Sequence, residues 1–155
     1  MSGTEISRGD PLSTELGQLH LRHHADMHAQ TPPGSIHMLP PGELARPGID
    51  FFVLRLDGRP VGMGALKRIG ADHAEIKSMH VLSEARGRGL SRLLLDHLLA
   101  HARAEGCSRV SLETGAEPIF APARALYTRA GFVECGPFEG YRPDPNSVFM
   151  TLDLA

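Results

Sequence analysis

The sequence predicts one α/β (α+β) domain over residues 1–155, built on a mixed central sheet. A chain of 155 residues is the usual size of one domain with its own core. Three apolar segments between residues 51 and 81 are separated only by tight turns, which predicts an antiparallel meander. A strongly amphipathic helix then joins the third strand to a fourth, which is typical of a βαβ crossover with parallel strands.

The composition is that of a soluble globular protein: 41% of the residues are hydrophobic, 22% are charged, and the formal net charge is −2. An excess of acidic residues disfavours nucleic acid as a partner. The longest aliphatic and aromatic run, residues 51–54, is far too short to cross a membrane, and no secretory signal precedes it. Cys107 and Cys135 are far apart in the sequence. A cytoplasmic location is therefore expected.

The first predicted helix spans residues 12–29. Asp10 and Pro11 provide a cap and a first-turn proline, and one apolar stripe follows at helical spacing: Leu12, Leu16, Leu19, His23 and Met27. The prolines and glycine at 32–34 end the helix. Residues 35–48 are expected to be a loop, with one short helical turn around 36–39.

The meander is predicted as strands 51–56, 59–69 and 74–81. Asp57-Gly58 makes a two-residue hairpin turn between the first two strands, and residues 70–72 form the next turn. The helix at 90–105 follows, with its apolar face formed by Leu90, Leu93, Leu94, Leu98 and Ala102.

The C-terminal part is predicted as a strand at 109–114, a helix at 123–130 that starts behind Pro122, and closing strands at 132–135 and 148–154. The strand at 109–114 is reached across a helix, so it is expected to lie parallel to the third strand. The Pro- and Gly-rich connection at 136–147 is long enough to line a functional site.

Residues 81–91 leave a strand, make a glycine-containing loop and open a helix, which is a geometry that binds anions. The first N–H groups of a helix have no intrahelical partner, and glycines let a phosphate approach the backbone closely. The glycine pattern alone is weak, because the Walker and full dinucleotide motifs are absent. A capping loop with incidental arginines, or an RNA-binding Arg-Gly patch, are the alternative interpretations.

Three segments together resemble the GCN5-related N-acetyltransferase (GNAT) family: the strand at 75–81, the Arg-Gly-Arg-Gly-Leu-Ser loop at 86–91, and the Leu-Tyr-Thr-Arg-Ala-Gly-Phe block at 126–132. The segments at 32–37 and 144–150 are similar to the bacterial YsnE-like branch of that family. The resemblance spans nearly the whole chain, and the loop followed by the later block is much more specific than either motif alone.

The resemblance implies a sheet whose two parallel central strands splay apart to admit acetyl-CoA as co-substrate, with no metal. Backbone groups of the loop would hold the pyrophosphate, namely those of Arg86, Gly87, Arg88, Gly89, Leu90 and Ser91. Main-chain groups of Met79, His80 and Val81 would pair with the pantetheine arm. Two positions depart from the family pattern: Ser91 replaces the usual Gly or Ala, and Phe120 stands where many members carry a CoA-contacting Asn.

Acyl transfer to an amine needs a base for the amine and an acid for the leaving thiolate. Tyr127 matches the family's tyrosine near the thioester sulfur, and its alternative role is core packing. Glu75 is the candidate base by position in the family, and the alternative is a rim glutamate paired with Lys77 or Arg109. Glu113 is the reserve candidate for the base, and water is a third.

Nine histidines invite a metal hypothesis, but no carboxylate or cysteine accompanies the pairs at ligand spacing, so packing or solvated histidines are favoured. Because the first helix usually covers the acceptor side in this family, four residues are candidates for substrate binding: His23, His37, Tyr141 and Asn146. For His23 a buried structural role is equally consistent with the sequence.

The predicted function is transfer of an acetyl group from acetyl-CoA to a primary amine of a small molecule, by direct attack in a ternary complex. The alternative is a non-catalytic CoA-binding or sensing module with the same fold. A phosphate- or RNA-binding module is disfavoured by the charge balance and by the absence of a stacking pattern of aromatic residues. The protein is expected to be a monomer or a homodimer.

Overall fold

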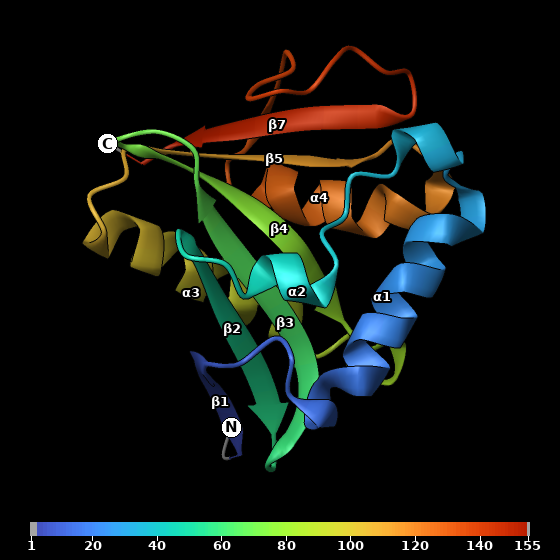
Figure 1. Ribbon diagram of the computed structural model, residues 1–155, viewed down its shortest axis with the longest axis vertical. Helices are drawn as coiled ribbons and strands as arrows, with labels where there is room; N and C mark the ends of the chain where they lie inside the picture. Colours follow the sequence, from blue (N-terminus) through green and yellow to red (C-terminus); the bar gives the residue numbers. More distant parts are fainter. Residues whose placement is uncertain (1–2, 155) are drawn as a thin grey trace.

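The computed structural model describes residues 3–154 and contains a seven-stranded sheet with the strand order β1-β2-β3-β4-β5-β7-β6 (Figure 1). Every neighbouring pair is antiparallel except β4 and β5, which are parallel. The predicted mixed sheet with an antiparallel meander and a βαβ crossover is confirmed. The strands are β1 (Thr4–Arg8), β2 (Ile49–Leu56), β3 (Arg59–Arg68), β4 (His73–Val81), β5 (Arg109–Gly115), β6 (Val133–Cys135) and β7 (Ser147–Asp153).

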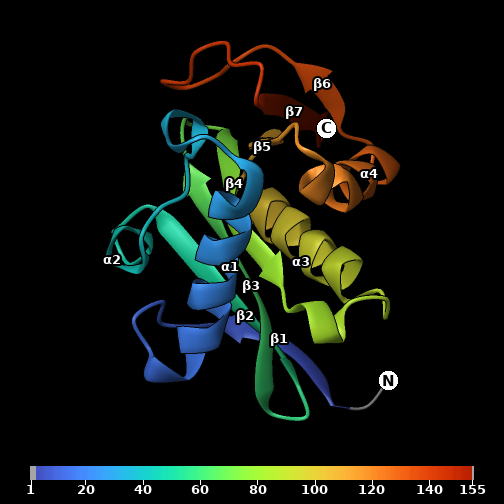
Figure 2. The same ribbon diagram turned by 90° about the vertical axis from the view of Figure 1, so that its right-hand side faces the viewer.

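Helices cover both faces of the sheet (Figure 2). α1 (Gly17–Gln30) and α2 (Pro41–Leu44) lie over one face, and α3 (Leu90–Ala104) and α4 (Ala121–Arg129) lie over the other. Two apolar clusters form the core: one packs α3 and α4 against the sheet, and the other joins residues of α1 and α2 to the sheet and also includes Leu90 and Leu94 of α3. No helix within residues 3–154 is long and apolar enough to span a membrane.

The N-terminal part differs from the prediction. The helix expected at 12–29 begins at Gly17 instead, after a single 3-10 turn at Thr14–Leu16, and Leu12 is 60% exposed rather than part of the buried stripe. The Asp10 carboxylate accepts a hydrogen bond from the Leu12 amide at 2.9 Å, which holds this segment in a turn. β1, which the sequence analysis did not predict, pairs antiparallel with β2.

The helical turn expected at 36–39 is also wrong. The connection instead contains a 3-10 turn at Pro33–Ser35 and the short helix α2, which begins with Pro41. A proline at the first helical position loses no hydrogen bond, so the proline-rich segment starts a helix at its end rather than in its middle.

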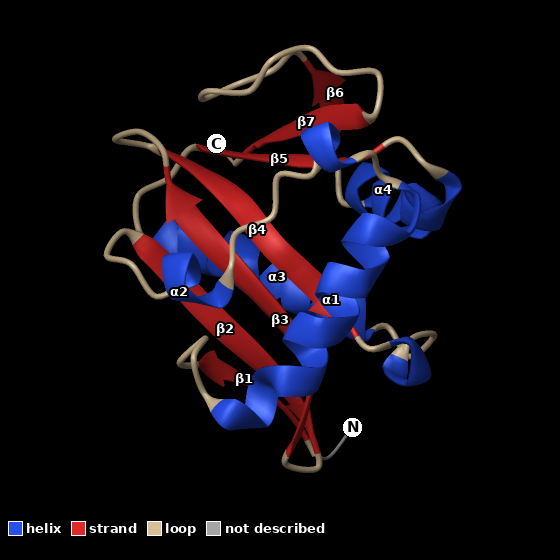
Figure 3. Cartoon of the chain, turned by 45° about the vertical axis from the view of Figure 1, so that its right-hand side comes forward, coloured by secondary structure: helices blue, strands red, loops and turns tan. Residues whose placement is uncertain are grey.

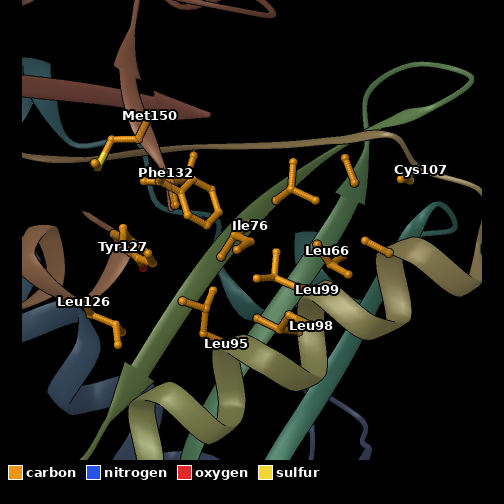
Figure 4. Packing of buried hydrophobic residues seen from close by; sticks show 14 of the residues in the cluster. Leu66, Ile76, Leu95, Leu98, Leu99, Cys107, Leu126, Tyr127, Phe132 and Met150 are labelled. Atoms are coloured by element: carbon orange, nitrogen blue, oxygen red, sulfur yellow. The ribbon is translucent and has the colours of Figure 1, made fainter. Parts of the chain in front are cut away.

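The predicted apolar face of α3 is wrong at one residue. Leu93 is 44% exposed, whereas Leu95 and Leu99 are buried and pack in the same cluster as Leu126 and Tyr127 of α4. Figure 4 shows Leu95, Leu98 and Leu99 gathered against the sheet, with Tyr127 near Phe132. The helix therefore packs against both the sheet and α4, and its buried face is wider than a single stripe.

The pairing of β4 with β5 stops halfway along β4. Its last residue pair is Ile76 with Leu112, although β4 continues to Val81 and β5 to Gly115. Beyond this point the two strands diverge (Figures 1 and 3). Ser78 has a φ of 55°, and the register with β3 shifts nearby between Met63 and Ala65, so β4 contains a bulge just past the end of the pairing.

Candidate active site

A cavity of about 470 Å³ opens where β4 and β5 separate. Its walls come from β4 after residue 75, the end of β5, the loop before α3, the inner face of α4, and α1. The splayed strands implied by the family resemblance are thus present, and the gap between them is continuous with the N-terminus of α3. A long chain-like ligand can run along this path.

Two glycines shape the loop at the N-terminus of α3. Gly87 and Gly89 have φ values of 81° and 74°, in the left-handed region that glycine adopts without strain, and Gly89 is the N-cap of α3. Both line the cavity, together with Leu90 and Ser91. The loop therefore exposes backbone at a helix N-terminus to the gap, which is the geometry that favours a phosphate.

The arginines of this region have separate positions. Arg86 lines the cavity, where its Nε donates to the Val81 carbonyl at 2.9 Å and its guanidinium pairs with Asp26 of α1 at 3.4 Å. Arg88 is exposed and is not among the residues that line the cavity. Arg92 and Arg129, which the sequence analysis did not single out, do line it.

The predicted pantetheine-binding residues, Met79, His80 and Val81, all line the cavity. His80 and Val81 pair with β3 on one side. On the other side no described strand pairs with β4 beyond Ile76, so this edge of the strand faces the gap. An extended chain inserted there would find an open strand edge to pair with.

Tyr127 lies both in the core and on the cavity wall. It is 7% exposed, packs edge-on against Phe132, and its hydroxyl lies 3.8 Å from the sulfur of Met79. Burial raises the pKa of Tyr127 to about 12. The phenol is consequently protonated at neutral pH and can donate a hydrogen bond into the gap. Tyr127 therefore belongs to the core and also lines the cavity, and its role as the acid stays a prediction.

Glu75 belongs to a buried polar cluster on the α1 face of the sheet. Its side chain is 2% exposed, so it is not a rim residue, and its Oε2 accepts a hydrogen bond from the Tyr141 hydroxyl at 2.6 Å. Lys77 Nζ lies 3.4 Å from the same oxygen and also donates to Tyr141 at 2.8 Å. Glu75 is not among the residues that line the gap, which it meets only through Lys77.

Glu113 on β5 lines the gap directly. Burial raises the pKa of Glu113, while Ser147, His37 and Lys77 act in the opposite direction and Glu75 raises it slightly further. A carboxyl group with a raised pKa is a better proton acceptor for an amine than an ordinary one. The reserve candidate of the sequence analysis is thus nearer to the gap than the first candidate.

Two imidazoles lie close together on the wall of the cavity. The rings of His23 on α1 and His80 on β4 have centroids 5.3 Å apart, and each residue is 8% exposed. Burial, followed by the charge of the other histidine, lowers the pKa of His23 to about 3, and burial followed by Arg86 lowers the pKa of His80 to about 4. The Nε2 atoms of both residues are buried without a hydrogen-bond partner.

The remaining acceptor candidates have different positions. His37 lines the gap, and its carbonyl accepts a hydrogen bond from Lys77 at 3.0 Å. Tyr141 lies behind it, ring edge against ring face, in the polar cluster. Asn146 donates to Ser35 at 3.3 Å and so connects the 136–147 segment to the connection after α1. Phe120 lines the gap beside Gly115, where its ring occupies the space that a Cβ would need.

Like Arg92 and Arg129, Asp26 lines the cavity and was not named in the sequence analysis. No local signal points to it, because its partner Arg86 is 60 residues away in the chain. Lys77 was named only as a possible partner of Glu75, and the structure confirms that pairing at 3.4 Å.

Outside the site, ligand atoms of Asp50, His101 and Glu105 lie within 4.8 Å of one another. The expectation that no carboxylate accompanies the histidine pairs is therefore wrong at His101, although Arg8 already pairs with Asp50 at 3.1 Å.

A mixed sheet with a parallel pair that opens into a cavity, beside a glycine loop at a helix N-terminus, defines a GNAT-type acyltransferase. The chain belongs to the acetyltransferase (GNAT) family, which it matches over residues 18–132. It is 42% identical to the uncharacterized N-acetyltransferase YsnE of Bacillus subtilis over 132 residues, 85% of this chain and 87% of that one. It is 39% identical to the IAA acetyltransferase of Azospirillum brasilense, covering 99% of this chain and 100% of that one.

Solved structures agree with this assignment. A Klebsiella pneumoniae protein, described provisionally as an acyl-CoA N-acyltransferase, superposes with a TM-score of 0.81 and 31% identity over 98% of both chains. A Salmonella typhimurium protein, described provisionally as an acetyltransferase and solved with acetyl-CoA, shares the fold, with a TM-score of 0.72 and 19% identity, over 99% of this chain and 95% of that one.

Proposed function

We propose that this protein transfers the acetyl group of acetyl-CoA to the amine of a small molecule by direct attack. One observation carries the proposal: β4 and β5 stop pairing at Ile76 and Leu112, and the cavity that begins there ends at the glycine loop of α3. The pyrophosphate would lie against backbone groups of residues 86–91, and the pantetheine would pair with the free edge of β4 at residues 79–81.

In the proposed reaction the amine nitrogen attacks the thioester carbon, the carbon–sulfur bond breaks, and the amine loses a proton. Glu113, a carboxylate that lines the gap, would accept this proton. The sulfur would leave as a thiolate, which takes up a proton from solvent to give the free thiol. Tyr127 would donate a hydrogen bond to the leaving sulfur. Its pKa of about 12 favours this role over full loss of its proton.

The test measures binding and turnover separately. Calorimetry with acetyl-CoA should give a saturable signal, and the melting temperature should rise, because acetyl-CoA binds only the folded chain. Release of free CoA thiol should then be followed with a panel of primary amines. Binding without thiol release to any amine would favour a non-catalytic CoA-binding module, and the absence of binding would reject both functions.

A further inference from the structure

A second cavity, of about 600 Å³, lies beside the first, between α1 and the segment that leads to α2. This volume is in the range of sites that hold small molecules. His23, Met38 and Ser78 line both cavities, so the two spaces adjoin at the bulge of β4. A molecule in the second cavity can therefore extend one end toward the gap where the thioester carbon is expected.

The second cavity combines aliphatic surface with imidazoles, and its described lining holds no acidic side chain. None of its described lining residues is Asp, Glu, Lys or Arg, and its polar side chains are four histidines and one serine: His20, His23, His24, His28 and Ser78. Leu21, Ile36 and Leu39 contribute the aliphatic surface, and Leu21 is 63% exposed. The first cavity contrasts with it, because Asp26, Arg86 and Glu113 all line that space.

The polar groups at the junction of the cavities are neutral. His23 Nε2 and Ser78 Oγ are both buried without a hydrogen-bond partner. A buried polar atom without a partner costs free energy, and a ligand that hydrogen-bonds with it removes that cost. The low pKa of His23, about 3, means that its imidazole carries no charge at neutral pH. It can exchange a hydrogen bond with an amine, but it cannot attract or repel a distant charge.

From these observations we infer that the acceptor is a monoamine with an aliphatic or aromatic body, held in the second cavity, and that polyamines and other acceptors with several charges are excluded. This inference rests on the proposed function, since it names the acceptor class of the same site. The single amine would extend past His23 and Ser78 toward Glu113. A second ammonium group would remain in the second cavity, where none of the described lining residues is a carboxylate that could pair with it.

The decisive comparison uses two amines of equal length, 1-hexylamine and 1,6-diaminohexane, which differ only by the second ammonium group. Calorimetry on the protein saturated with free CoA measures their affinities without turnover. The hexylamine should bind at least about tenfold more tightly, because desolvating an unpaired charge is costly. Equal affinities, tighter binding of the diamine, or binding of neither amine would overturn the inference.

A variant that introduces a negative charge into the second cavity tests the same preference for monoamines. Ile36→Asp places a carboxylate in the second cavity, and Ile36→Asn is the matched control of nearly the same shape without the charge. The preference for hexylamine should shrink severalfold or invert in the Asp variant and persist in the Asn variant. An unchanged ratio in Ile36→Asp, with acetyl-CoA still raising its melting temperature, would count against the cavity. If Ile36→Asp does not fold, the wild-type comparison decides alone.

The two proposals fail separately. If hexylamine binds with the expected preference but no thiol is released from acetyl-CoA, the proposed acetyl transfer fails while the ligand class of the cavity stands. If acetyl-CoA is turned over with the diamine at a higher kcat/KM than with hexylamine, the acetyltransferase stands and the acceptor class is wrong.

Discussion

The hydroxyl of Tyr141 donates a 2.6 Å hydrogen bond to Glu75, whose carboxylate is 2% exposed. Burial raises the pKa of the Tyr141 phenol and the charge of Glu75 raises it further, so Tyr141 stays protonated at neutral pH. The 136–147 segment is thereby tied to the middle of β4.

Tyr141→Phe should lower the free energy of unfolding by about 1–3 kcal/mol, because it leaves a buried carboxylate with Lys77 as its remaining partner. Urea unfolding measures the loss. Tyr141→Phe in a Glu75→Gln background is the control, and a similar loss in both backgrounds would show that the hydroxyl does not act through the carboxylate.

Glu113→Gln should remove the acidic limb of the kcat/KM profile. A base must be deprotonated, and the pKa of Glu113 is raised by burial, so activity should fall as the pH drops through a value above the usual carboxyl range. The rate at neutral pH should fall by about ten- to a thousandfold. Glu75→Gln is the matched variant. Loss of the limb in Glu75→Gln alone would instead identify Glu75 as the base.

Tyr127→Phe keeps the ring packed against Phe132 and removes only the hydroxyl. We expect kcat to fall by about ten- to a hundredfold, with acetyl-CoA affinity and the melting temperature nearly unchanged. Because the pKa of Tyr127 is about 12, the wild-type profile should show no basic limb from this residue below pH of about 11. Wild-type turnover in the variant would leave Tyr127 as a core residue.

Gly89→Glu should abolish acetyl-CoA binding, since a side chain and a negative charge would both enter the expected pyrophosphate position. The change also strains a left-handed backbone, at a cost of about 1–2 kcal/mol. Gly106→Glu is the matched control, because Gly106 has a φ of 85° at the other end of α3, outside the cavity. Calorimetry should find binding lost only in the first variant; equal loss in both would mean that strain is the cause.

His23 makes the fold acid-sensitive. Its pKa is about 3 in the folded protein and about 6.5 when unfolded, so the unfolded chain binds more protons between these values. The contribution of His23 to the free energy of unfolding is therefore fully present above a pH of about 6.5 and decreases as the pH falls below that value. His23→Leu should lessen the fall in melting temperature between about pH 7 and pH 5. His28→Leu, an exposed position on the same helix, should leave it unchanged.

The sequence predicted the meander, the crossover and α3 because each follows from local signals: alternation, tight turns and a helical stripe. It missed β1, since residues 4–8 alternate weakly and become a strand only by pairing with β2. Leu93 was misplaced because burial on α3 depends on α4, which is distant in the chain.

In the candidate site, too, local signals were predicted from the sequence, whereas contacts between distant residues were not. Residues 79–81 and 86–91 were found through local motifs and a family resemblance, and all but Arg88 line the gap. The partnership of Glu75 with Tyr141 joins residues 66 positions apart, and nothing in one sequence encodes it. The second cavity likewise forms only when the connection after α1 folds back along that helix.

The parallel seam between β4 and β5 holds just four residue pairs, whereas β2 and β3 share eight. The strands up to β4 and those from β5 onward are consequently joined by a short ladder, and the segment that contains α3 is the covalent connection between them. A ligand lying along the open edge of β4 would contact both β4 and β5 beyond the last residue pair and so connect the two strands there. Amide hydrogen exchange should then slow at residues 77–81 and along β5 together, so that occupancy of the gap sets the rigidity of the whole sheet.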